Sequence, residues 1–116
     1  MNAPDKYQHI DFTPPQEVAE RAAHGLELRE RFNRGGTEVG VERAQQLKRR
    51  ETLSPDIIKK MYSYFARHQV DKDTENFGDE DNPSAGYVAW LLWGGDEGKA
   101  WVDTIREQMR EADRAA

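Results

Sequence analysis

The chain contains no cysteine among its 116 residues. Disulfide bonds, thiolate catalysis and cysteine-based zinc sites are therefore excluded. No apolar run approaches the roughly 18–20 residues that a membrane-spanning helix needs. The first residues, MNAPDKYQHIDF, lack the basic and then apolar regions of a signal peptide. These absences lead us to expect a soluble protein of the cytoplasm that does not enter a membrane.

A recognisable set of catalytic residues is missing as well. Residues 94–97 spell GGDE, the signature of diguanylate cyclases, but here they separate two helical segments in a chain too short for that fold. The histidines, His9, His24 and His68, match no zinc-binding spacing. No serine lies in the context of a nucleophile elbow. The sequence therefore predicts a protein that is not an enzyme and uses no cofactor.

One charged segment resembles the opening of a calcium-binding loop. Asp71, Asp73 and Glu75 have the spacing of the first ligands, but Asn76 occupies the position of the required glycine. The bidentate glutamate of that loop is also replaced by asparagine. These departures favour a solvated acidic loop, residues 71–82, over a weak divalent-cation site.

The acidic charge is concentrated in this loop. The chain has a net charge of −5, and the loop carries six carboxylates against one lysine, so the rest of the chain is neutral overall. A segment of this kind can steer a basic partner by charge complementarity. We therefore mark its carboxylates as candidate partner-binding residues: Asp71, Asp73, Glu75, Asp79, Glu80 and Asp81.

Basic residues form a looser cluster, made of Arg43, Lys48, Arg49, Arg50, Lys59, Lys60 and Arg67. Lys59 and Arg67 lie about two helical turns apart, so they can share a face that contacts phosphates. The alternative is an ordinary solvated face, because Glu42 and Glu51 are interspersed and cations are favoured near helix C-termini. A nucleic-acid interface on this cluster stays open as a second hypothesis.

Helix start and stop signals recur along the chain, and no segment alternates convincingly enough to be a strand. Thr13 and Ser54, whose hydroxyl groups can cap a helix, each precede a proline, and Ser84 follows a proline. Paired glycines at residues 35–36 and 94–95 are signals that end a helix. We predict helices over residues 13–33, from 37 or 40 to about 50, 55–69 and 83–93, and a last helix capped by Asp96.

Residues 1–12 are predicted to form an extended N-terminal arm, with Tyr7, Ile10 and Phe12 as docking points. The predicted fold is all-α: a small bundle of about five short helices in one domain, residues 13–116, with the acidic loop between the third and fourth helices.

Aromatic residues are concentrated as well, since residues 61–101 hold all three tryptophans. Residues 85–93 are apolar almost all round, which is typical of a helix enclosed by its neighbours. Trp90, Trp93 and Trp101 are predicted to meet in the core. The alternative is that one of them is an exposed anchor for a partner, because tryptophan is enriched at binding hot spots. Trp93 is the candidate for that role.

The central part of the chain resembles an uncharacterised helical module associated with bacteriophage and prophage proteins. That module has a tract like YFARHxVDK, a variable loop, and then PSxGxxAWxLWGGDxGxxW. The matching positions here are residues 64–68, 70–72, 83–86, 89–90, 92–96, 98 and 101. Residues 25–47, with GG and VGVERA, are similar to the first half of the module. The resemblance implies a viral setting, but it implies no activity and no functional residues.

Together these observations predict a small non-enzymatic phage protein that acts by protein–protein interaction. It would be a minor virion component or an accessory factor that binds a host protein, located in the host bacterial cytoplasm or in the virion. The second hypothesis is a nucleic-acid-binding module that uses the basic cluster between residues 43 and 67.

Overall fold

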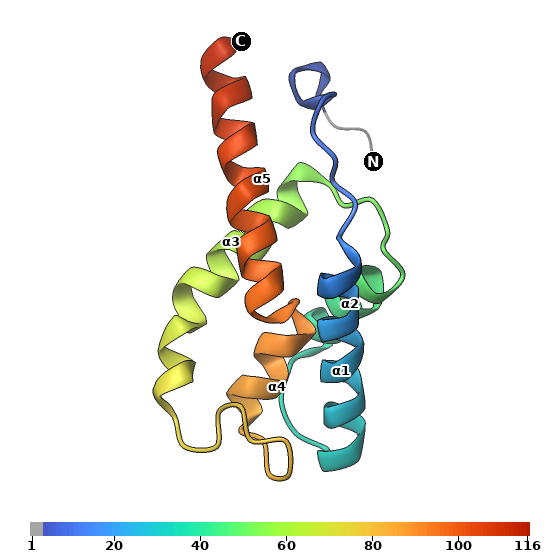
Figure 1. Cartoon of the computed structure of the whole chain (residues 1–116), viewed down its shortest axis with the longest axis vertical. Helices are drawn as coiled ribbons and strands as arrows, with labels where there is room; N and C mark the ends of the chain where they lie inside the picture. Colours follow the sequence, from blue (N-terminus) through green and yellow to red (C-terminus); the bar gives the residue numbers. More distant parts are fainter. Residues whose placement is uncertain (1–3) are drawn as a thin grey trace.

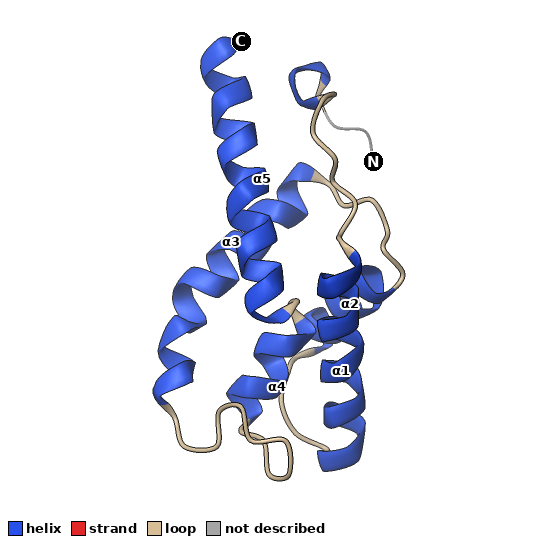
Figure 2. Cartoon of the chain, in the orientation of Figure 1, coloured by secondary structure: helices blue, strands red, loops and turns tan. Residues whose placement is uncertain are grey.

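The structure is a computed structural model of the chain, and it describes residues 4–116. Regular structure in this range is entirely helical (Figures 1 and 2), which confirms the predicted all-α fold. The α-helices are α1 (Gln16–Phe32), α2 (Glu38–Lys48), α3 (Pro55–His68), α4 (Ala85–Leu92) and α5 (Gly95–Ala115), and the short 3-10 helices are η1 (Asp5–Tyr7) and η2 (Gln69–Asp73).

Three helices begin at residues with a capping hydroxyl. Ser54 and Ser84 are caps that the sequence predicts, and Thr37 corresponds to the first of the two starts, residue 37 or 40, that the sequence leaves open for α2. The side-chain hydroxyls of Thr37, Ser54 and Ser84 each accept a hydrogen bond from the backbone N–H three residues further on, at 3.0–3.2 Å. Each bond satisfies one N–H group that the first helical turn leaves without an intrahelical partner.

The predicted start of α1 is wrong by three residues. The helix begins at Gln16, and Pro15 is its N-cap with an extended ψ of 163°. A residue that precedes proline is disfavoured in the helical conformation. A cap at Thr13 would require Pro14 to be the first helical residue, and Pro14 precedes Pro15, so the helix cannot begin there.

The predicted cap of the last helix is also wrong. α5 begins at Gly95, before Asp96, and its N-cap is Gly94 in the left-handed conformation with φ of 112°. A Cβ atom at Gly94 would lie 2.9 Å from Cα of Gly98. Glycine at this position therefore allows the tight junction between α4 and α5.

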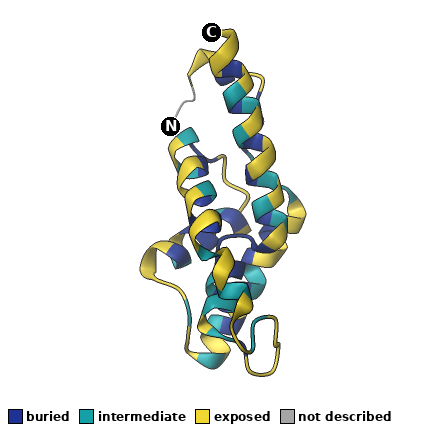
Figure 3. Cartoon of the chain, turned by 90° about the vertical axis from the view of Figure 1, so that its left-hand side faces the viewer, coloured by how far each residue is buried: buried dark blue, intermediate teal, exposed yellow. Residues whose placement is uncertain are grey.

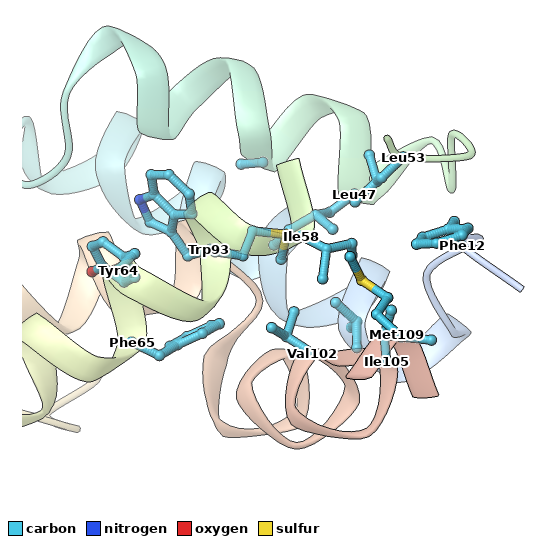
Figure 4. Packing of buried hydrophobic residues seen from close by; sticks show 14 of the residues in the cluster. Phe12, Leu47, Leu53, Ile58, Tyr64, Phe65, Trp93, Val102, Ile105 and Met109 are labelled. Carbon is cyan, nitrogen blue, oxygen red and sulfur yellow. The ribbon is translucent and has the colours of Figure 1, made fainter. Parts of the chain in front are cut away.

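Helix α4 lies at the centre of the core. It packs against α1, α2, α3 and α5, as predicted for a helix that is apolar almost all round. Gly25 allows α1 to approach it closely, because a Cβ atom there would lie 2.8 Å from the backbone nitrogen of Leu92. The main apolar cluster continues along α5 through residues such as Val102 and Met109 (Figure 4).

The N-terminal arm packs along the end of α5. Tyr7, Ile10 and Phe12 are all buried, and the Tyr7 hydroxyl donates a 2.7 Å hydrogen bond to Asp113. Residues 1–3 of the predicted arm lie outside the described residues.

The molecule is elongated, with extents of 47 × 27 × 21 Å. The arm and the C-terminal part of α5 form one end, and the acidic loop forms the other (Figure 1). Exposed residues cover the outer side of α5 and most of the loop (Figure 3). Within residues 4–116, none of the helices combines the length and the apolar character needed to cross a bilayer.

Candidate functional site

The acidic loop is held by specific hydrogen bonds and ring contacts. Its first three residues belong to η2. Oδ1 of Asp79 accepts hydrogen bonds from the backbone N–H groups of Asp81 at 2.9 Å and Asn82 at 3.1 Å. Phe77 packs its ring against the ring of Tyr87, with centroids 5.2 Å apart. These contacts hold the loop in a defined path over α4.

The candidate carboxylates of the loop differ in what they do. Asp71 pairs with Nδ1 of His68 at 3.1 Å and so ties the loop to the end of α3. Asp79 is engaged in the turn described above. Asp73, Glu75 and Asp81 are exposed. The six candidates therefore do not form one patch of free charge.

Glu80 connects the loop to two helices. Its carboxylate accepts a hydrogen bond from the hydroxyl of Tyr87 and pairs with Nε2 of His24. The hydrogen bond from Tyr87 is the main cause that lowers the pKa of Glu80. Burial, together with the bond to Glu80, raises the pKa of Tyr87 to about 12. The ionised form of Glu80 is thus favoured between α1 and α4.

This contact places the loop beside α1 and forms a groove of about 470 Å³, which we call the acidic groove. Four of its lining residues are carboxylates, two from α1 and two from the loop. The floor includes Leu28, which belongs to a small apolar cluster with Val88 and Leu91. The complete lining is His24, Glu27, Leu28, Glu30, Arg31, Glu80 and Asp81.

Two of the groove carboxylates, Glu27 and Glu30, carry no sequence signal that points to the loop. Their spacing of three residues predicts only that they lie on one side of α1. Their proximity to Glu80 and Asp81 arises from the packing of the loop against α1, and local sequence patterns do not report such packing.

Asp96 fixes the other side of the loop. Its Oδ1 atom lies 2.7 Å from Nζ of Lys72 and accepts a 2.9 Å hydrogen bond from the indole N–H of Trp90. Burial opposes ionisation of this carboxyl, but the bonds from Lys72 and Trp90 hold the pKa of Asp96 below its usual value. The side chain that the sequence predicts as a helix cap thus joins η2, α4 and α5.

Trp93 lies in the core and is only 9% exposed. Its ring stacks on Tyr64 of α3, with centroids 4.5 Å apart and an interplanar angle of 8° (Figure 4). Cζ of Arg43 lies 5.4 Å from the Trp93 ring centre. Trp93 is therefore not an exposed anchor for a partner, because neighbouring helices cover its ring.

Arg43, a member of the predicted basic cluster, is buried and 7% exposed. Its Nη1 donates a 2.6 Å hydrogen bond to the side chain of Gln46, and burial lowers the pKa of Arg43. A side chain in this position stabilises the packing of α2 on Trp93 and does not offer a surface contact for phosphates.

The other members of the basic cluster are exposed: Lys48, Arg49, Arg50, Lys59, Lys60 and Arg67. Two of them already have partners, since Arg49 pairs with Glu51 at 3.4 Å and Arg50 donates to the carbonyl of Pro14 at 2.8 Å. Helices α2 and α3 do not pack against each other. The two parts of the predicted cluster therefore do not lie on one packed helix pair.

Within residues 4–116, no group of three or more histidine, aspartate and glutamate side chains is arranged to hold a metal ion. No protein-family model, curated protein or solved structure matches this chain.

Proposed function

We propose that the chain is a small non-enzymatic phage protein that acts by binding another protein, and that the acidic groove receives a basic segment of that partner. The observation that supports this most is the convergence of four carboxylates on one groove: Glu27, Glu30, Glu80 and Asp81. A hollow lined by charges of one sign focuses the electrostatic field and attracts cationic groups. Charge complementarity then guides the encounter and its register.

The groove also contains His24 and Arg31, so its four carboxylates outnumber its basic side chains. His24 pairs with Glu80, and the guanidinium of Arg31 lies 5.0 Å from the ring centre of Phe32. Phe32 and Tyr87 are partly buried beside the apolar cluster that contains Leu28. Lysine and arginine side chains have apolar stems below a charged head, so this combination of apolar floor and acidic rim suits a basic peptide segment.

The viral setting rests on the resemblance of residues 59–101 to a phage-associated module. In that setting the partner is a structural protein of the virion or a protein of the host. Mass spectrometry of purified virions distinguishes the two roles of the chain. A virion component is present in the virions in reproducible copy number, and an accessory factor is not.

The test of the groove is affinity capture with paired charge-reversed variants. E27K/E30K reverses two groove carboxylates on α1 and leaves the Glu80 contacts in place. E42K/E111K changes the net charge by the same amount at exposed sites on α2 and α5. We expect the wild-type chain and E42K/E111K to retain the same partner, and E27K/E30K to retain about tenfold less of it, since mutation of interface charges weakens a charge-steered complex.

Thermal unfolding must first show that both variants are folded. If folded E27K/E30K retains as much partner as E42K/E111K does, the acidic groove is not the binding site. If the wild-type chain retains nothing in virion and host extracts, the protein-binding function is wrong.

A further inference from the structure

We propose that a groove between α1 and α5 binds a lysine or arginine side chain of the partner protein, with the cation placed against the indole ring of Trp101. We call it the Trp101 groove. The inference rests on the proposed function for the chemistry of the partner, a basic protein segment. It assigns to that segment a second contact, outside the acidic groove.

The Trp101 groove lies where the first turns of α1 and of α5 pack together (Figure 1). It has a volume of about 480 Å³, and its lining is Glu17, Glu97, Ala100, Trp101 and Thr104. None of these described lining residues is basic. The groove therefore combines an aromatic ring with two carboxylates, and its lining supplies no cation.

Trp101 differs from the other two tryptophans in its surroundings. Trp90 and Trp93 are buried, and each lies beside a cation of the chain itself, Lys72 at 4.9 Å and Arg43 at 5.4 Å from the ring centre. Trp101 is partly exposed and packs against the main apolar cluster. Within residues 4–116, no lysine or arginine lies over its ring. The structure thus gives the exposed position, which the sequence left open for one tryptophan, to Trp101.

The carboxylates of the groove are only partly neutralised by the chain. Glu97 pairs with Arg21 at 3.1 Å, whereas Glu17 is exposed and forms no ion pair within residues 4–116. Lys99 of α5 pairs with Asp103 at 2.9 Å and lines a different groove, between α3 and α5. The rim of the groove therefore keeps a net negative charge, which favours a cation over a phosphate.

A basic side chain of a protein fits this lining. The apolar stem of lysine or arginine can pack on Ala100 and on the indole ring, while its charged head reaches the carboxylate of Glu17. Of the aromatic rings, that of tryptophan attracts a cation most strongly. Because the core holds one side of Trp101, the ring is already in place before a partner binds, which lowers the entropic cost of binding.

The Trp101 groove and the acidic groove lie along the same stripe of α1. Glu17, Arg21, His24 and Leu28 are spaced by four, three and four residues, so they share one side of the helix. Glu17 lines the Trp101 groove, and His24 and Leu28 line the acidic groove. The rise along α1 from Glu17 to Leu28 is about 16 Å. An extended chain covers this distance with about five residues, so one basic segment can occupy both grooves.

The experiment is an NMR titration of the full chain with two peptides of the same composition. The split peptide, acetyl-RRGSGSRR-amide, places about five residues between its two arginine pairs and can reach both grooves. The contiguous peptide, acetyl-RRRRGSGS-amide, can fill one groove at a time. The indole N–H signal of Trp101 reports on the Trp101 groove, and the backbone amide of Leu28 reports on the acidic groove.

The variants are E17K, Trp101→Leu and the control E38K. Glu38 is an exposed carboxylate in the first turn of α2, as Glu17 is in the first turn of α1. The two reversals therefore change the net charge and the helix dipole contact equally. Thermal unfolding establishes that each variant is folded, and E17K carries the test if Trp101→Leu is not.

We expect both reporter signals of the wild-type chain to saturate with the split peptide. The split peptide should bind about tenfold more tightly than the contiguous peptide, because its second contact forms within the same complex. E38K should keep this advantage. E17K and Trp101→Leu should lose most of it, since one groove no longer attracts an arginine.

The Trp101 groove is overturned if its indole signal does not saturate, or if folded E17K binds the split peptide as tightly as E38K does. Saturation at Leu28 alone would then leave the proposed function intact. Saturation at Trp101 without a response at Leu28 supports the Trp101 groove and contradicts the acidic groove. Equal affinities for the two peptides would overturn the joint occupancy of both grooves by one segment.

Discussion

Among single residues, Trp93 connects three helices through one side chain. It follows α4, stacks on Tyr64 of α3 and faces the guanidinium group of Arg43 from α2. Tyr64 in turn stacks on His68, with centroids 4.4 Å apart. Four side chains thus form a continuous column that fixes α2, α3 and α4 relative to one another.

Replacing Trp93 by alanine is expected to lower the free energy of unfolding by about 3–5 kcal/mol, because the substitution leaves a large cavity in the core. Urea denaturation followed by circular dichroism measures this loss. Trp93→Phe should lose less, since a phenyl ring can still stack on Tyr64. Stability near that of the wild-type chain for Trp93→Ala would show that the column does not form in solution.

The residues that could be predicted from the sequence are those whose role depends on near neighbours in the chain. Ser54 and Ser84 cap helices because each accepts a hydrogen bond from a backbone N–H three residues away. Arg43 could not be predicted in the same way. Its sequence context is that of a solvated basic face, and only the packing of α2 against Trp93 makes it a buried residue.

Among the elements, the C-terminal part of α5 depends on the N-terminal arm. Apolar residues of α5, including Met109 and Ala112, belong to the same buried cluster as Tyr7, Ile10 and Phe12. The carbonyl of Phe12 also accepts a 3.0 Å hydrogen bond from the backbone N–H of Leu53. The arm therefore covers an apolar face that this end of α5 would otherwise expose.

Phe12→Ala should destabilise this end of the molecule selectively. We expect a loss of about 3 kcal/mol, with faster hydrogen exchange at backbone amides of residues 106–115 than in the wild-type chain. Amides of α4 should keep most of their protection, because its burial depends on other helices. Gln8→Ala, at an exposed position of the arm, is the matched control. An equal loss of protection in all helices would contradict a local role for the arm.

In the whole molecule, the acidic groove arises from packing between segments that are distant in the chain. The acidic groove brings Glu27 and Glu80 together through the contact of His24 with Glu80. Packing of α5 against α3 likewise brings Arg106 and Arg110 beside Tyr62. Helical periodicity and composition predict the all-α class, because the class depends on repeated local patterns. They do not predict these contacts, because neither pattern reports which faces of two helices meet.

The same long-range contacts make the stability of the molecule depend on pH. The pKa values of three carboxyls are lowered in the folded chain: Glu80 by its bond from Tyr87, Asp113 by its bond from Lys6, and Asp96 by bonds from Lys72 and Trp90 against the opposing effect of burial. The unfolded chain therefore binds more protons than the folded chain does at acidic pH. Their contribution is fully present above the usual pKa of each carboxyl, and it is lost as the pH falls through the lowered value.

Glu80→Gln isolates one of these contributions. The free energy of unfolding of the wild-type chain should exceed that of Glu80→Gln at neutral pH, and the difference should shrink as the pH falls below the usual glutamate value of 4.5. Urea denaturation across this pH range measures the difference. Glu75→Gln changes an exposed carboxylate of the same loop, and its curve should run parallel to that of the wild-type chain. A difference for Glu80→Gln that does not change with pH would mean that the bond from Tyr87 does not hold the loop in solution. The acidic groove would then lose the contact that places its two sides together.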